Sequence, residues 1–180
     1  MKLLFFSDLH GVATAFELLL KQAEALSPDR LVFLGDALYH GPRNGVPPFY
    51  DSRRTAEIFN AHRNCILAVR GNCDSEVDQM MIDLPIMADY AMAYSDGTEF
   101  FLTHGHIWNE SRLPNIGPGT VLVHGHTHVP TLHVGPGGTT VFNPGSVALP
   151  KCGIPPTFGF FDGEKLSVRR LEDGEILIQN

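Results

Sequence analysis

The sequence predicts an α/β protein in which two sheets pack face to face with helices outside. Residues 2–34 support this first, because a strand, a helix and a second strand in this order form a βαβ unit with parallel strands. The second half of the chain supports the same prediction, because its short expected strands are separated by turns that favour antiparallel pairing. A chain of 180 residues suits one domain with a substantial core, so we expect a single domain over residues 1–180.

The first half is predicted to alternate strands and helices. A short apolar run after Met1 suits a buried strand, and the next segment has the apolar face of a helix that Pro28 ends. A loop rich in proline and glycine follows the second strand, and Asp51 or Ser52 is expected to cap the next helix. The expected elements are strand 2–7, helix 13–26, strand 31–34, loop 39–50, helix 51–63 and strand 65–69.

The second half is predicted to be mainly strands. The dipeptide Asp96-Gly97 lies between two apolar runs and is a strong hairpin signal. A turn rich in glycine and proline joins two later strands, and the last three strands form a meander with turns at 162–163 and 173–174. The expected strands are 90–94, 99–103, 120–123, 132–134, 139–142, 158–161, 166–171 and 176–178.

The composition excludes several classes of protein. A net charge of -7 argues against nonspecific nucleic-acid binding, which needs a basic surface. It does not exclude a phosphate substrate, because bound cations would reverse the field inside one pocket. Three scattered cysteines are too few for a disulfide framework, so a cytoplasmic location is expected. No apolar stretch is long enough to cross a membrane.

Residues suited to metal binding follow five of the predicted strands. His126 and His128 lie two residues apart after an apolar run, so both imidazoles can point to one side of an extended chain. Mixed oxygen and nitrogen donors without a thiolate suit Mn²⁺, Fe²⁺ or Zn²⁺ in a hydrolytic site. Seven donors suit two ions about 3.5–4 Å apart that share one carboxylate. The candidate ligands are Asp8, His10, Asp36, Asn72, His104, His126 and His128.

The order of these motifs resembles a known family. D-x-H at 8–10, G-D at 35–36, G-N at 71–72, H-G-H at 104–106 and G-H-T-H at 125–128 are similar to the calcineurin-like metallophosphoesterase superfamily. The segments 35–44, 70–80 and 143–147 resemble the small bacterial phosphodiesterase branch of that superfamily. The resemblance extends over essentially the whole chain.

This resemblance implies a fold, a metal site and an activity. The fold is a four-layer α-β-β-α sandwich, and the substrate is a small phosphodiester attacked in line by a metal-bridging hydroxide. The cofactors are two divalent ions, Mn²⁺ first, with Zn²⁺, Fe²⁺, Ni²⁺ or Co²⁺ as alternatives. A homo-oligomer, either a dimer or a tetramer, is also compatible with it. One ion takes Asp8, His10, Asp36 and His128, and the other takes Asp36, Asn72, His104 and His126.

Further residues are expected to act on the substrate. Arg43, His40 and Asn44 lie on the loop that follows Asp36, and an arginine there can hold a phosphate with two hydrogen bonds. Cys73 stands where many phosphomonoesterases of the superfamily have a histidine, and it is expected to line the pocket. A thiol is a poor substitute for an imidazole in acid catalysis, which favours phosphodiesters with good leaving groups. With Asp36, Asn72 and His104, Cys73 completes the expected catalytic set.

Two other functions are open alternatives. The same site could serve a phosphomonoesterase or a nucleotide pyrophosphatase. A different class is a non-catalytic scaffold that binds proteins, as in the retromer trafficking subunit with this fold. The completeness of the ligand set separates the classes, because every expected metal position is filled in this chain.

Overall fold

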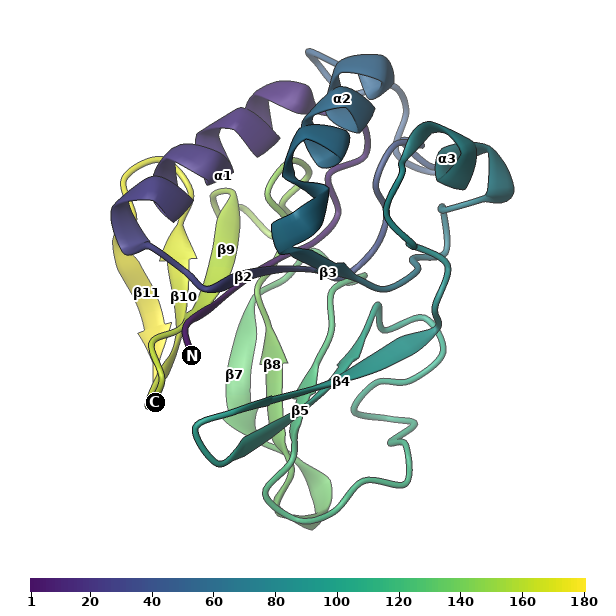
Figure 1. The fold of residues 1–180 in the computed structure, drawn as a ribbon. Helices are drawn as coiled ribbons and strands as arrows, with labels where there is room; N and C mark the ends of the chain where they lie inside the picture. The colour runs from purple at the N-terminus through teal and green to yellow at the C-terminus, as the bar shows by residue number, and fades with distance from the viewer.

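The computed structural model describes all 180 residues and contains the two predicted sheets, packed face to face (Figure 1). The larger sheet has six strands, of which β1, β2 and β3 are parallel and β9, β10 and β11 form the predicted antiparallel meander. Its spatial order is β11 (Ile176–Gln179), β10 (Leu166–Arg170), β9 (Thr157–Phe161), β1 (Leu3–Phe6), β2 (Arg30–Phe33) and β3 (Ile66–Ala68).

The smaller sheet has five strands and is also mixed. Its centre is parallel, with β6 between β5 and β8, and the edge strands β4 and β7 are antiparallel to their neighbours. Asp96 and Gly97, both with positive φ, form the predicted hairpin between β4 and β5. The spatial order is β4 (Tyr90–Ser95), β5 (Thr98–Thr103), β6 (Val121–Val123), β8 (Thr140–Asn143) and β7 (Thr131–Val134).

Strand β1 lies between two apolar cores, because its successive side chains point to opposite faces of the sheet. Leu4 and Phe6 face the helices, whereas Leu3 and Phe5 face the other sheet. Burial on both faces explains why this strand is a continuous apolar run. The core between the sheets is dominated by the rings of Phe5, Phe100, Phe142 and Phe161. Aromatic packing therefore fixes the position of one sheet against the other.

The helices lie on one side of the molecule. Helices α1 (Ala13–Leu26) and α2 (Ser52–His62) cover the outer face of the six-stranded sheet, and Asp51 caps α2 through the backbone amide of Arg54 (Figure 1). A short helix α3 (Glu76–Met81) was not predicted from the sequence. Two 3₁₀ turns, η1 (Arg63–Cys65) and η2 (Pro136–Gly138), complete the helical elements.

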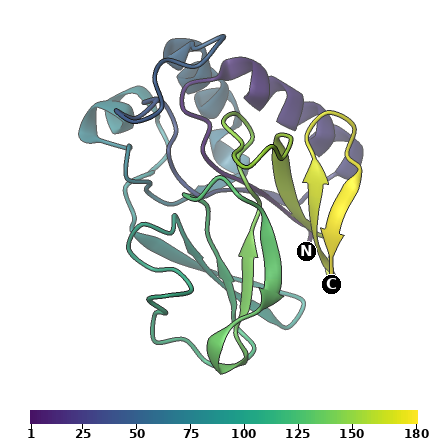
Figure 2. The same cartoon turned by 180° about the vertical axis from the view of Figure 1, so that it is seen from behind.

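The predicted fold class is confirmed, although its fourth layer contains no α-helix. No α-helix follows α3 in the chain, and Figure 2 shows none against the five-stranded sheet. Residues 104–120, which connect β5 to β6, contain Pro114, Pro118 and three glycines, which disfavour a long helix in this segment. The longest helix, α1, has 14 residues, and no helix combines the length and apolar character needed to cross a membrane.

Candidate metal centre

All seven candidate ligands lie just beyond the carboxyl ends of parallel strands. Asp8 and His10 follow β1, Asp36 follows β2 and Asn72 follows β3. The five-stranded sheet adds His104 after β5 and the pair His126 and His128 after β6. Ligands of open α/β sheets bind at this edge, because the chain leaves each strand there and turns away.

The backbone at these strand ends is unusual. Asp8, His10, Asp36, His126 and His128 all have positive φ, between 47° and 66°. They make up five of the nine non-glycine residues with positive φ in the chain. This left-handed conformation costs energy for residues with a Cβ atom and concentrates at functional sites. It turns each strand end sharply, so that the side chains face one point.

Four of the side chains form a first cluster. The Asp8 Oδ1 atom lies 3.4 Å from His128 Nε2 and 3.8 Å from His10 Nε2. His10 Nε2 lies in turn 3.6 Å from Asp36 Oδ2. Asp8 Oδ1 and His10 Nε2 are buried and have no hydrogen-bond partner. Native proteins rarely leave such atoms unpaired, so both are available to a ligand.

A second cluster surrounds His104 and shares Asp36 with the first. His104 Nε2 lies 3.5 Å from Asp36 Oδ2, 3.1 Å from Asn72 Oδ1 and 3.3 Å from His126 Nδ1. The Nδ1 atom of His104 donates to the Leu34 carbonyl, which leaves a lone pair on Nε2 in the neutral ring. The lone pairs of His104 Nε2, Asp36 Oδ2 and Asn72 Oδ1 then point toward one another, and a proton or a cation between them removes their repulsion.

The donor set fits divalent cations. Ligand atoms about 2.0–2.2 Å from one ion lie roughly 3.0–3.6 Å from each other, close to the spacings found here. His10 and His128 donate from Nδ1 to the carbonyls of Tyr39 and Leu149, which aims each Nε2 into the first cluster. A backbone hydrogen bond of this kind normally orients a metal-bound histidine. The residues therefore fit two ions that flank Asp36.

Asp36 and His104 shift each other's pKa in the second cluster when no metal is bound. Burial by itself would raise the pKa of Asp36, but hydrogen bonding to His104 and the charge of that ring hold it well below its usual range. Burial by itself would lower the pKa of His104. The hydrogen bond to Asp36 and the charge of its carboxylate have the larger effect and raise this pKa to about 9. Burial and the nearby His104 charge lower the pKa of His126 to about 4. The proton on the His104 ring, which faces the Asp36 carboxylate, supplies the positive charge that a bound cation would supply.

Asp74 connects the loops after β2 and β3 and was not among the expected site residues. Its buried carboxylate accepts hydrogen bonds from the backbone amides of Asp36 and Gly71 on one oxygen and from Ala37 on the other. Burial, opposed by these hydrogen bonds, raises its pKa to about 6. The loops also touch directly, since a Cβ on Gly71 would lie 2.0 Å from Asp36 Oδ1. Asp74 thus fixes the strand ends that carry Asp36 and Asn72.

Asn143 holds the loop after β6 in a comparable way. Its buried side-chain amide donates to the Gly125 carbonyl and to the Thr127 hydroxyl, at 2.9 and 3.0 Å. The side-chain oxygen Oδ1 of Asn143 accepts from the backbone amide of Gly145 and so shapes the turn that follows β8. The backbone amide of His126 also donates to Asp8, which joins the two sheets at the site.

A pocket of about 700 Å³ opens over the two clusters. Arg43, Asn44 and Cys73 line it as expected, whereas the ring of His40 packs between Tyr39 and Tyr50 and is not part of the lining. Asp8 and His104 lie beneath the pocket and are fully buried. The remaining lining residues include the expected ligands His10, Asp36, Asn72, His126 and His128.

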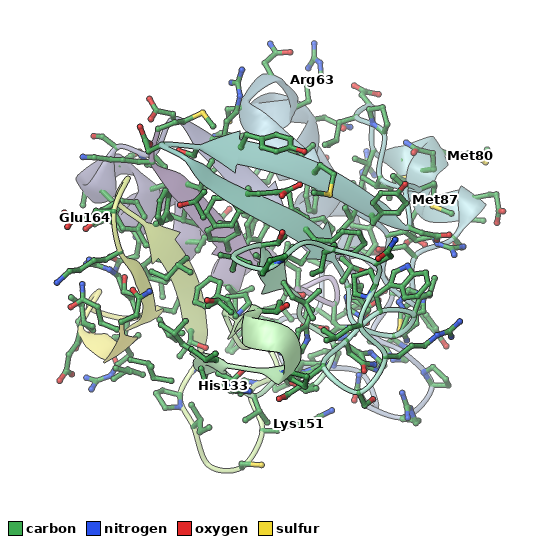
Figure 3. All side chains as sticks on the ribbon, turned by 90° about the horizontal axis from the view of Figure 1, so that it is seen from below. Arg63, Met80, Met87, His133, Lys151 and Glu164 are labelled. Atoms are coloured by element: carbon green, nitrogen blue, oxygen red, sulfur yellow. The ribbon has the colours of Figure 1, made fainter.

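Two cationic side chains border the pocket from different loops. Arg43 follows β2, and Lys151, labelled in Figure 3, lies on the loop between β8 and β9. Both are exposed and neither forms an ion pair. Lys151 was missed because no local pattern relates this loop to strand ends more than 20 residues away. Two cations without an ion-pair partner at the rim of the pocket provide contacts for a negatively charged ligand.

Cys73 lies half-buried at the floor of the pocket. Its backbone amide donates to Asp36 Oδ1, and its sulfur accepts from the side-chain amide of Asn72. Burial and the charge of Asp36 raise the pKa of the thiol to about 12. Without metal, the thiol is therefore neutral at ordinary pH.

Comparisons with known proteins agree with this geometry. The family model described as the calcineurin-like phosphoesterase superfamily domain matches residues 1–165. Phosphodiesterase YfcE of Escherichia coli K12 is 44% identical over 179 residues, which cover 99% of this chain and 97% of YfcE. The solved structure of Escherichia coli YfcE, described as a phosphoesterase, superposes with a TM-score of 0.96 at 43% identity, over 100% of this chain and 98% of that one.

A more distant structure shares the fold. An archaeal phosphodiesterase superposes with a TM-score of 0.61 at 22% identity, over 100% of this chain and 99% of that one. The family model spans most of the chain, and the similarity to YfcE extends over nearly its full length. The chain belongs to the calcineurin-like phosphoesterase superfamily and is a phosphoric ester hydrolase.

Proposed function

We propose that this hydrolase cleaves small phosphodiesters with two divalent cations that share Asp36. One cation would be held by Asp8, His10, Asp36 and His128, and the other by Asp36, Asn72, His104 and His126. The observation that carries this assignment is the pair of buried, unpaired atoms, Asp8 Oδ1 and His10 Nε2, which face the remaining donors. Such atoms are costly in a fold unless they serve a ligand.

The cations would supply Lewis acidity, an activated water and neutralisation of the charge that develops on phosphorus. The residues of the chain would supply position. Arg43 can bind two non-bridging phosphate oxygens through its planar guanidinium, and Lys151 can add a point charge from the opposite loop. Asp36, fixed by Asp74, sets where the phosphate stands relative to both clusters.

The neutral thiol of Cys73 supports diesters with weakly basic leaving groups. A thiol is a poor substitute for an imidazole in acid catalysis, so it gives a departing alkoxide little help. A phenolate leaves without such help, and we therefore expect aryl diesters to react faster than alkyl diesters. The imidazole that would assist a phosphomonoester is absent at this position.

Manganese is the proposed native ion. Histidines contribute four of the seven ligands, and imidazole disfavours Mg²⁺, which prefers oxygen. The test starts with protein treated with chelator, to which Mn²⁺ or Mg²⁺ is added before assay. We expect activity on bis(4-nitrophenyl) phosphate to vanish with chelator and to return further with Mn²⁺ than with Mg²⁺.

A parallel assay with 4-nitrophenyl phosphate separates diester from monoester hydrolysis. The proposed function predicts a higher kcat/KM for the diester. Full activity in chelator would contradict the metal site, and a preference for the monoester would favour the phosphomonoesterase alternative. Failure to hydrolyse any phosphate ester with two ions bound would favour the scaffold.

A further inference from the structure

A second hollow lies beside the metal pocket and differs from it in chemistry. It is a groove of about 380 Å³ between the loop after β2 and helix α3. Five of its eight lining residues are hydrophobic, compared with two of fourteen in the metal pocket. Tyr39 and Ser75 line both hollows, so the groove continues directly from the metal pocket.

One wall of the groove is aromatic and firmly anchored. The ring of His40 lies between those of Tyr39 and Tyr50, with ring centres 4.8 and 5.6 Å away. Tyr50 packs so closely on Gly11 that a Cβ there would lie 2.4 Å from the tyrosine ring. The amide of Asp51 also donates to the Gly11 carbonyl at 2.7 Å. This wall is therefore fixed to the segment that immediately follows His10.

The opposite wall is the exposed apolar side of α3. Val77 is 68% exposed and Met81 is 45% exposed, and both line the groove. A capping box between Ser75 and Asp78 fixes the first turn of this helix. Adjacent exposed apolar side chains that line a hollow commonly mark a binding site. Methionine suits such a wall, because its flexible side chain adapts to ligands of different shape.

We infer that this groove binds one ester group of the phosphodiester substrate, namely an aromatic or other flat apolar alcohol. The inference rests on the proposed function, in which the phosphate occupies the adjoining metal pocket. A diester carries two ester groups on one phosphorus, and only two of the fourteen residues that line the metal pocket are hydrophobic. The groove offers that surface next to it, and burial of apolar area there would favour aryl over small alkyl groups.

Symmetric phosphodiesters provide a test that does not depend on which ester group leaves. Diphenyl phosphate and dimethyl phosphate are compared as competitive inhibitors of bis(4-nitrophenyl) phosphate hydrolysis by the protein loaded with Mn²⁺. The wild type should bind diphenyl phosphate at least about tenfold more tightly than dimethyl phosphate, since a phenyl ring buries far more apolar area in the groove than a methyl group does.

A double variant and a single control variant, both on α3, test the groove. Met81→Gln, combined with Val77→Asn, should raise the Ki of diphenyl phosphate several-fold and leave the Ki of dimethyl phosphate unchanged. Met80→Gln is the control, because Met80 is 84% exposed on the same helix, projects outward in Figure 3 and does not line the groove. It should change neither Ki.

The outcomes separate the groove from the proposed function. If the wild type hydrolyses the diester but binds both inhibitors equally, or if the double variant keeps the wild-type ratio of Ki values, the groove assignment is overturned while the function stands. If no diester is hydrolysed with both ions bound, the proposed function itself fails. If the double variant changes only the oligomeric mass in size-exclusion chromatography, a second copy covers the groove, and the inference is also overturned.

Discussion

The two sheets contribute different chemistry to the proposed metal centre. The six-stranded sheet supplies three oxygen donors and one histidine, whereas the five-stranded sheet supplies histidines alone. Asp36 Oδ2 lies 3.6 Å from His10 Nε2 and 3.5 Å from His104 Nε2, and Asp8 Oδ1 also lies 4.0 Å from His104 Nε2. The proposed ligands come together only where the sheets meet, so the aromatic core between the sheets also sets the spacing of these side chains. An anionic half and an imidazole half together select ions that accept both kinds of donor.

The two halves are held by hydrogen bonds of opposite direction. On the anionic half, the Asp74 carboxylate accepts from three backbone amides. On the imidazole half, the Asn143 amide donates to the carbonyl of Gly125 and the hydroxyl of Thr127. Asp74 accepts from the N–H groups of its loops, and Asn143 donates to the oxygen atoms of its loop. Asp74→Asn should therefore place a donor against a donor, and Asn143→Asp should place an acceptor against an acceptor.

Asp36→Asn should have the largest effect, because it weakens both clusters at once. We expect phosphodiesterase activity to fall more than about 100-fold and both ions to bind more weakly. Metal content by mass spectrometry and kcat/KM measure the two effects. Asp83→Asn, at an exposed position outside the pocket, is the control and should behave as wild type. Normal turnover with two bound ions in Asp36→Asn would show that the shared ligand is wrongly assigned.

Asp74→Asn should disturb the anionic half. It replaces one acceptor oxygen with an amide group that faces a backbone N–H, so the loops of Asp36 and Asn72 lose a shared anchor. We expect metal affinity to fall about 10–100-fold, the range for residues that orient ligands. Isothermal titration with Mn²⁺ measures this change. Wild-type affinity in Asp74→Asn would mean that the loops hold their shape without the carboxylate.

Asn143→Asp should disturb the imidazole half by a smaller amount. Its carboxylate would face the Gly125 carbonyl, but that loop keeps hydrogen bonds from Gly125 to His104 and from His126 to Asp8. We expect about a tenfold loss of Mn²⁺ affinity. The same titration compares the two variants directly, and a larger loss in Asn143→Asp than in Asp74→Asn would reverse the proposed ranking.

Metal affinity should also depend on pH through the imidazole half. The pKa of His104 is raised to about 9 without metal, so below pH 9 an ion must displace a proton from that ring. Affinity should therefore rise about tenfold for each pH unit between pH 6.5 and 8.5. Titrations at several pH values, in buffers of different ionisation heat, measure both the slope and the protons released. A flat profile without proton release would show that His104 is neutral before metal binds.

Cys73→Ser should have the smallest effect on activity. A neutral thiol contributes little acid catalysis, so we expect the rate on aryl diesters to change by less than about tenfold. A series of diesters with different leaving groups should show a steep dependence on leaving-group pKa in both proteins. A greater loss in Cys73→Ser with both ions bound would instead identify Cys73 as a proton donor.

Much of the site could be predicted because its ligands lie at the ends of apolar strands. Apolar runs that end in Asp, Asn or His indicate both the strand and the edge where side chains meet. Helix α3 was missed although Ser75 and Asp78 form a capping box, because six residues show little helical periodicity.

The roles of Asp74, Asn143 and Lys151 could not be predicted in the same way. Each depends on a loop that is distant in sequence, and the sequence near each residue is that of an ordinary turn. The fourth layer differs from the prediction because the connection from β5 to β6 forms no α-helix, and its prolines and glycines disfavour a long one. Long-range hydrogen bonds are therefore the part of this site that the structure adds.

Anomalous X-ray diffraction from a crystal grown with Mn²⁺ tests the shared metal centre most directly. The proposed site predicts two anomalous peaks on either side of the Asp36 carboxylate. One peak should contact Asp8, His10 and His128, and the other should contact Asn72, His104 and His126. A single peak, or two peaks that do not share Asp36, would contradict a centre built jointly by the two sheets.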